Sequence, residues 1–175
     1  MKTHVISYSL TGNNEKLAKK IANALQADFS AIEEKNDRNY FTIVLDILLN
    51  RTPTLKNIKI PLEHYDHIIF VAPVWLGKIA TPLRALLKQL KGKAKEYSFV
   101  SISAGADGKE NPNLEKELTK RTGITPDFVI NLLISNILRD TPKPTGKQLD
   151  EFRLSDADAG ILAETVLKRI NGIAD

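Results

Sequence analysis

The sequence predicts one α/β domain across residues 1–175, built on a doubly wound, five-stranded parallel sheet with helices on both faces. Continuous apolar runs such as residues 68–72 are typical of strands that are covered on both sides. These runs alternate with stretches in which apolar residues recur every three or four positions, as on one side of a helix. The alternation of the two patterns predicts parallel strands joined by right-handed helical crossovers.

Each expected element has its own signal in the sequence. Strands are expected at 4–8, 29–33, 68–72, 97–103 and 128–134, and helices at 14–25, 40–49, 82–90, 111–122 and 155–170. Pro82 suits a first helical turn, Gly123 suits the position after a helix end, and Ser155 suits an N-cap. Residues 140–150, which are rich in proline and glycine, are expected to form a surface loop.

Composition narrows the class of protein. The 175 residues include no cysteine, which excludes disulfides, thiolate metal sites and a cysteine nucleophile. No apolar run approaches the roughly 20 residues of a membrane helix, and the start of the chain turns polar too soon for a signal peptide. We therefore expect a cytoplasmic protein with no membrane segment.

The net charge of +4 is a small excess of 25 basic over 21 acidic residues. Part of it is concentrated at Lys88, Lys91, Lys93 and Lys95, where no interleaved aromatic residue is suited to stacking on bases. This pattern argues against a nucleic-acid partner. The cluster is either a solvated helix end or a functional basic patch.

The loop after the first strand, Ser9-Leu10-Thr11-Gly12-Asn13-Asn14, runs directly into a helix. Its hydroxyls, its glycine and the free amides of the helix N-terminus are suited to holding a phosphate without a lysine. An ordinary capped turn would use the same residue types. Neither the three-glycine dinucleotide motif nor the P-loop motif is present, so a single phosphomonoester fits better.

Three segments together resemble the flavodoxin family. The loop above resembles that family's phosphate loop for FMN, residues 65–77 with Pro82-Leu83 resemble its third strand and second flavin loop, and residues 103–108 follow the fourth strand. The resemblance implies the strand order 2-1-3-4-5 and the cofactor FMN. It also implies these cofactor-binding residues: Ser9, Leu10, Thr11, Gly12, Asn13, Asn14, Pro73, Val74, Trp75, Leu76, Gly77, Ser103, Ala104, Gly105 and Asp107.

Three features depart from the family's dedicated electron carriers. Those carriers usually end the first motif in Thr or Ser, where this chain has Asn14, and they are acidic, whereas this chain is basic. Carriers also often stack an aromatic residue on the outer face of the flavin. This chain has no aromatic residue between Phe99 and Phe128, which predicts an open outer face.

Trp75, the only tryptophan, and Leu76 are the candidates for contact with the flavin ring, because an indole or aliphatic wall can cover its apolar face. Alternatively, Trp75 only packs beneath its loop. His64 and His67 precede a strand and are expected at the surface, and His4 is expected to be structural. Because a flavin brings its own redox chemistry, no catalytic residue is assigned, and no metal site is expected.

The helix at 40–49 is apolar almost all round, with only Thr42 and Asp46 polar. This exceeds the stripe of about 100° that one sheet face requires. Either residues 50–64 fold back over the remainder, or the helix forms a homodimer or partner surface.

The expected function is FMN-dependent electron transfer or reduction, with the chain acting as a flavoprotein and, if an enzyme, an oxidoreductase driven by NAD(P)H or a reduced protein. Its partner would be a redox protein or a small acceptor such as a quinone. The alternative is a non-redox module on the same fold that binds a phosphate ligand or a protein.

Overall fold

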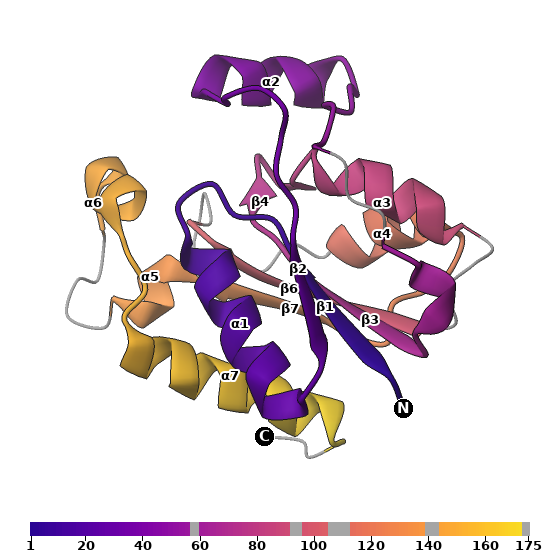
Figure 1. Ribbon diagram of the computed structural model, residues 1–175. Coiled ribbons are helices and arrows are strands. Elements are labelled where there is room, and N and C mark those ends of the chain that lie inside the picture. Colours follow the sequence, from indigo (N-terminus) through magenta and orange to yellow (C-terminus); the bar gives the residue numbers. More distant parts are fainter. Residues whose placement is uncertain (57–59, 92–95, 105–112, 139–143, 173–175) are drawn as a thin grey trace.

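The computed structural model describes residues 1–56, 60–91, 96–104, 113–138 and 144–172 (Figure 1). Its strands are β1 (Thr3–Ser7), β2 (Asp28–Ala31), β3 (His67–Val71), β4 (Val74–Trp75), β5 (Lys78–Ile79), β6 (Glu96–Ser103) and β7 (Val129–Leu133). Its α-helices are α1 (Asn13–Leu25), α2 (Tyr40–Leu48), α3 (Leu83–Leu90), α4 (Leu114–Thr122), α5 (Ile134–Ile137), α6 (Gly146–Glu151) and α7 (Asp156–Ile170). A 3₁₀ turn, η1, spans Leu62–His64. None of the helices in these ranges is long and apolar enough to cross a bilayer.

Five strands form one sheet in the order β2-β1-β3-β6-β7, and all its pairs are parallel. Counted along the sheet's own strands, this is the predicted order 2-1-3-4-5. The ends of β1 and β3 are level, because Ser7 pairs with Val71. The chain leaves β1 toward β2 and then returns to the other side of β1 to form β3. The strand order therefore reverses between β1 and β3, and the carboxyl ends of these two strands flank the reversal.

Helices cover both faces of the sheet, as predicted (Figure 1). On one face, α1 and α7 pack over a cluster that includes Val5, Leu17 and Val166. On the other, α3 and α4 pack over a cluster that includes Ile6, Leu83 and Leu118. Because both faces are covered, β3 is buried along its whole length. Burial on both sides is the physical reason for its unbroken apolar sequence.

The helix ends confirm two of the expected signals. Gly123 ends α4 with a positive φ of 78°, the left-handed conformation that glycine adopts without strain. The Ser155 hydroxyl accepts a hydrogen bond of 3.0 Å from the backbone amide of Asp158 and so caps α7. Asn111 and Pro112, the expected start of the helix that ends at Gly123, lie outside the described residues.

The prediction of a loop over residues 140–150 is wrong for its second half, because α6 begins at Gly146. Thr145 caps this helix: its hydroxyl accepts a hydrogen bond from the Gln148 amide, and the Gln148 side chain accepts one from the Thr145 amide. A threonine followed three positions later by glutamine is the capping-box signature that the loop prediction overlooked. The short hairpin of β4 and β5 and the single turn of α5 were likewise not expected.

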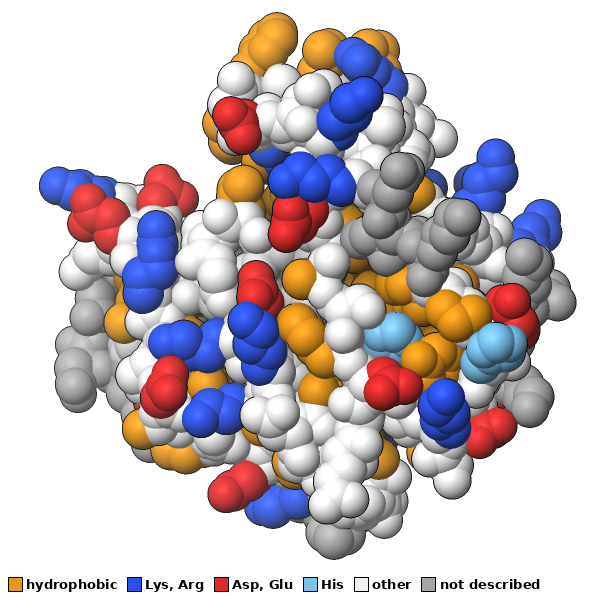
Figure 2. Space-filling model, viewed as in Figure 1, with side chains coloured by type: hydrophobic (Ala, Val, Ile, Leu, Met, Phe, Trp, Pro, Cys, Tyr) orange, Lys and Arg blue, Asp and Glu red, His pale blue; other side chains and the backbone are white. Residues whose placement is uncertain are grey.

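α2 stands apart from the layers over the carboxyl edge of the sheet (Figure 1). Its buried residues are Ile43 and Asp46, whereas its large apolar side chains Tyr40, Phe41 and Leu48 are more than 70% exposed. Figure 2 shows hydrophobic side chains on this part of the surface. Residues 54–56 pair with residues 33–35 and leave those side chains exposed. The prediction of a homodimer or partner surface here stays a prediction.

His67 corrects the expectation of a surface residue. It is the first residue of β3 and only 4% exposed, and its Nε2 lies 2.9 Å from Ser98 Oγ and 3.2 Å from Asp127 Oδ2. Burial lowers the pKa of His67, against the opposing effect of the Asp127 and Glu96 carboxylates. Burial also lowers the pKa of His4, which is structural as expected.

We expect the stability of the protein to fall as pH decreases from about 7 to about 5.5. Below the ordinary histidine pKa of about 6.5, the unfolded chain takes up protons that His4 and His67 resist in the folded state. Each histidine contributes a slope of at most about 1.4 kcal/mol per pH unit. Urea unfolding across this pH range measures the slope, and His67→Gln should reduce it. The exposed His64 supplies the control, and an equal reduction by His64→Gln would contradict this assignment.

Candidate functional site

The three segments that resemble flavin loops meet at the carboxyl edge of the sheet. They follow β1, β3 and β6, which are neighbours in the sheet order. Main-chain hydrogen bonds join their starts: the Tyr8 amide donates to Val71 O at 3.1 Å, and the Ala72 amide donates to Val100 O at 3.0 Å. In a doubly wound sheet this edge, beside the reversal of strand order, is where ligands bind.

The loop after β1 is open to solvent where it enters α1. Leu10, Thr11 and Gly12 are exposed, and Ser9 is partly exposed. Gly12 holds φ at +87° directly before the helix and offers no capping side chain. The Ser9 hydroxyl accepts a hydrogen bond of 3.2 Å from the Asn14 amide. The loop therefore presents two hydroxyls and the positive end of a 13-residue helix at the surface, a set of donors suited to an anion.

The Asn14 side chain is directed away from solvent and joins α1 to β6. Its Nδ2 donates to Ile102 O at 2.9 Å, and its Oδ1 accepts from the Ile102 amide at 2.8 Å. Both ends of the amide are therefore used, and the residue is buried. A threonine or serine, which carriers of the family have at this position, is too short and lacks the paired donor and acceptor. The departure at Asn14 thus has a structural explanation.

The Asn13 side chain makes a similar pair of bonds with the segment before α7. Its Nδ2 donates to Phe152 O at 3.0 Å, and its Oδ1 accepts from the Leu154 amide at 2.8 Å. Of the six loop residues predicted to bind a cofactor, these two asparagines use their side chains to hold the loop. The hydroxyls of Ser9 and Thr11 remain suited to meeting a phosphate, together with the loop's backbone amides other than that of Asn14, which donates to Ser9.

Pro73, Val74, Trp75, Leu76 and Gly77, the predicted second loop, form a tight hairpin rather than an irregular loop. β4 and β5 are antiparallel, with Val74 opposite Ile79. Leu76 and Gly77 have φ values of +48° and +71°. Glycine adopts this conformation readily, but leucine is strained by about 1 kcal/mol or more. The pairing of β4 with β5 imposes this turn and places the Leu76 side chain, which is 60% exposed, at the tip of the hairpin.

Trp75 contacts two side chains from other segments. The Tyr8 ring meets it edge-on, with centroids 5.6 Å apart and an interplanar angle of 87°. The Arg38 guanidinium carbon lies 5.3 Å from the centroid of the indole ring. Trp75 is only partly buried, and it packs against the core on the α3 side of the sheet. It therefore has packing contacts of its own in addition to the predicted role at a flavin.

The third predicted segment is described only in part. Ser103 is buried at the end of β6, and its hydroxyl donates a hydrogen bond of 2.9 Å to Asn131 Oδ1. Ala104 is exposed next to it. Gly105 and Asp107, the other two predicted residues, lie outside the described residues. The Ser103 side chain is thus used in packing β6 against β7.

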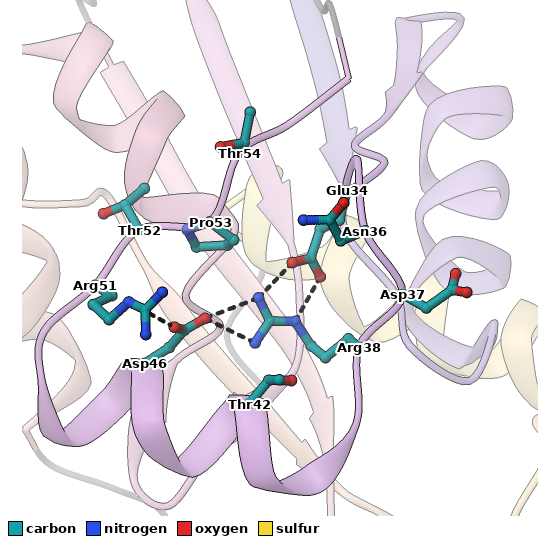
Figure 3. A pocket seen from close by; sticks show the side chains of 10 residues that line it. All are labelled: Glu34, Asn36, Asp37, Arg38, Thr42, Asp46, Arg51, Thr52, Pro53 and Thr54. Carbon is teal, nitrogen blue, oxygen red and sulfur yellow. Dashed lines mark hydrogen bonds and ion pairs between the residues drawn. The ribbon is translucent and has the colours of Figure 1, made fainter.

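Beside the hairpin lies a buried ionic network that the sequence analysis missed. Glu34 and Asp46 flank the Arg38 guanidinium (Figure 3), and the side chains of all three are at most 10% exposed. They line a cavity of about 220 Å³. Arg51 pairs with the far oxygen of Asp46 at 3.6 Å. The only signal in the sequence was the single charge, Asp46, within an otherwise apolar helix.

The two described lysines of the basic cluster lie at the other end of the sheet. Lys88 and Lys91, both exposed, stand at the end of α3, and β6 then begins at Glu96 beside the first residue of β3. Lys93 and Lys95 are outside the described residues. Because α3 runs back from the carboxyl edge to the amino edge, the two described lysines are remote from the candidate site.

Among known proteins, the chain matches solved structures of similar fold. Neither a protein-family model nor a curated protein sequence matches the chain. A flavoprotein from Lactobacillus acidophilus NCFM, solved in complex with FMN, aligns with a TM-score of 0.65 and 24% identity, covering 81% of this chain and 99% of the other. The apo-form of the flavoprotein from that organism aligns with a TM-score of 0.53 and 25% identity over 78% of this chain and 95% of the other. A protein from Bacteroides eggerthii DSM 20697 that is described as a flavoprotein aligns with a TM-score of 0.64 and 16% identity, covering 95% and 98%.

These alignments agree with the architecture derived from the chain itself. The strand order, the reversal between β1 and β3 and the helices on both faces are all present in the described residues. The resemblance seen in the sequence is therefore confirmed at the level of the fold, and this chain has a flavodoxin-like fold.

Proposed function

We propose that this chain is an FMN-binding flavoprotein that reduces a small acceptor such as a quinone, with electrons from NAD(P)H or a reduced protein. The observation that carries the proposal is the exposed, hydroxyl-lined entry into α1 at the reversal of strand order. The donor set there fits a phosphomonoester: two hydroxyls and free helix amides, held in place by the Asn13 and Asn14 side chains. The flavoprotein of similar fold that was solved with FMN supports the choice of flavin.

Each group at the site has a part in this proposal. Ser9, Thr11 and the amides before α1 would hold the phosphate. The hairpin tip, with Trp75 and Leu76, would cover one side of the ring. When bound, FMN supplies the redox chemistry itself, so the protein's contribution is to bind, orient and shield the ring.

Flavin content after purification without denaturation tests the proposal. We expect a yellow protein with the absorption bands of an oxidised flavin, bleached by NADH, NADPH or a chemical reductant. A colourless protein that also fails to take up added FMN would favour the alternative, a module that binds another phosphate ligand or a protein partner without redox chemistry.

Saturation with FMN should quench the fluorescence of Trp75, which reports alone because it is the only tryptophan. Trp75→Ala should raise the FMN dissociation constant about tenfold, since an aromatic contact is worth up to about 1.5 kcal/mol beyond burial of area. Fluorescence titration measures the first effect, and absorbance titration measures the second. Emission that stays unchanged at saturation would place Trp75 away from the flavin.

Salt dependence of turnover distinguishes an enzyme from an electron shuttle. A shuttle docks through charges, and its rate falls as the screening length shrinks from ~10 Å at ~0.1 M to ~3 Å at ~1 M salt. We expect turnover with a neutral quinone that changes little over this range, because Lys88 and Lys91 lie far from the site. Turnover only with an acidic protein acceptor, collapsing in salt, would identify a shuttle instead.

A further inference from the structure

Trp75 is contacted by two residues that one carboxylate joins. The Tyr8 hydroxyl donates to Glu34 Oε1 at 2.6 Å, and Arg38 Nε donates to the same oxygen at 2.6 Å. Arg38 Nη2 also bonds the second Glu34 oxygen, which makes the guanidinium pairing bidentate. Since Tyr8 and Arg38 each touch the indole, the four side chains form a closed ring of contacts with Glu34 opposite Trp75.

This closed ring of contacts includes two buried charged side chains, and the bonds between them fix its geometry. The Arg38 side chain is 4% exposed and that of Glu34 is 10% exposed. A guanidinium in this position has a fixed plane, because two forked bonds set its orientation, and its flat surface can stack on an aromatic ring. Asp46 meets Arg38 on its other side, with Nη1 and Nη2 each 3.1 Å from Oδ2 (Figure 3). Because Asp46 belongs to α2, this helix also contributes to holding the Arg38 guanidinium in place.

Other bonds already hold the backbone of residues 33–35 against residues 54–56. The Lys35 amide donates to Thr54 O at 3.0 Å, the Lys56 amide donates to Glu33 O at 2.9 Å, and the side chains of Glu33 and Lys56 pair at 2.7 Å on the surface. The inward-facing carboxylate of Glu34 is not required for this attachment. Its bonds lead instead to the two residues that contact Trp75.

We propose that Glu34 is a positioning residue for the flavin site: through Tyr8 and Arg38 it fixes the indole of Trp75 where that ring covers the cofactor. The proposal rests on the proposed function for its cofactor. The part of the proposal that concerns the position of Trp75 does not depend on a bound flavin. The indole would contact the flavin ring and not the phosphate. Loss of the Glu34 carboxylate should therefore weaken the binding of FMN and of riboflavin, which lacks the phosphate, by the same factor.

The experiment compares Glu34→Gln and Tyr8→Phe with a control, Glu33→Gln. The control removes the carboxylate of the preceding residue, which belongs to an exposed ion pair. In the protein without flavin, we expect Glu34→Gln to shift the emission of Trp75 and increase its quenching by acrylamide. With flavin, the dissociation constants for FMN and riboflavin should both rise about tenfold, the effect of losing one well-placed aromatic contact. Glu33→Gln should change neither the emission nor the affinities by more than about twofold.

Tyr8→Phe removes only one hydroxyl, so it tests the same connection if Glu34→Gln does not fold. It should shift the emission in the same direction and weaken both flavins by a smaller factor. Folded Glu34→Gln or Tyr8→Phe protein with unchanged emission would overturn the positioning role. Weakening of FMN alone would also overturn it, since that result would assign Glu34 to the phosphate. A wild-type protein that binds no flavin overturns the proposed function, while the emission measurements still decide whether Glu34 places Trp75.

Discussion

Asn14→Ala should lower the free energy of unfolding by about 2–6 kcal/mol. The substitution leaves the amide and the carbonyl of Ile102 buried without their partner, and each such group costs about 1–3 kcal/mol. Few single substitutions exceed this range, because typical effects are about 0.5–3 kcal/mol. Urea unfolding followed by circular dichroism measures the difference.

Asn23, which is exposed on the same helix, offers the matched control. Asn23→Ala should change stability by no more than about 0.5 kcal/mol, as surface substitutions usually do. Asn14→Thr, which introduces a residue typical of the family's carriers, should also destabilise, because one short hydroxyl does not span both Ile102 groups. An Asn14→Ala protein as stable as wild type would contradict the structural role and return Asn14 to the list of candidate phosphate ligands.

Thr11→Val should weaken FMN about ten- to a hundredfold while leaving riboflavin almost unchanged. The change keeps the shape of the side chain but removes a hydroxyl, and a hydrogen bond to a charged group is worth about 1.5–3 kcal/mol. Because Thr11 is exposed, the folded protein should keep its stability. Parallel titrations with the two flavins measure the ratio of their dissociation constants.

Leu10→Ala serves as the control for Thr11→Val, because it alters the neighbouring exposed side chain without removing a hydrogen-bond donor. It should leave the ratio of the two affinities unchanged. Equal weakening of FMN and riboflavin by Thr11→Val would mean that this loop does not hold the phosphate. Together with Trp75→Ala, which should weaken both flavins alike, the comparison separates recognition of the phosphate from recognition of the ring.

The strands and helices were predictable because the residue pattern that indicates each of them lies within one short segment. An unbroken apolar run such as residues 68–72 reports burial on both faces, and the stripe of Leu17, Ile21 and Leu25 reports one covered face of a helix. The position of the site followed from the topology, since the loops after the first, third and fourth strands of a doubly wound sheet meet at one edge. The hairpin at Leu76 was not predictable, because leucine gives no signal for a positive φ.

α2 and His67 show where local patterns are insufficient. The pattern of α2 indicated excess apolar surface, but not that the helix would bury Asp46 against Arg38 and expose Tyr40, Phe41 and Leu48. His67 looked like a surface residue because it precedes the strand expected at 68–72. In the fold it faces Ser98 and Asp127, which come from segments 31 and 60 positions later in the chain.

The sequence by itself determined the fold class, the strand order through its family resemblance, and the edge of the sheet where a ligand would bind. Only the tertiary structure decided which side chains remain free to bind it. Asn13 and Asn14 read as phosphate ligands, yet they bond to backbone 141 and 88 positions away. The physical reason is that periodicity records whether a residue is covered, whereas a polar side chain's partner depends on which distant segments the folded sheet brings beside it.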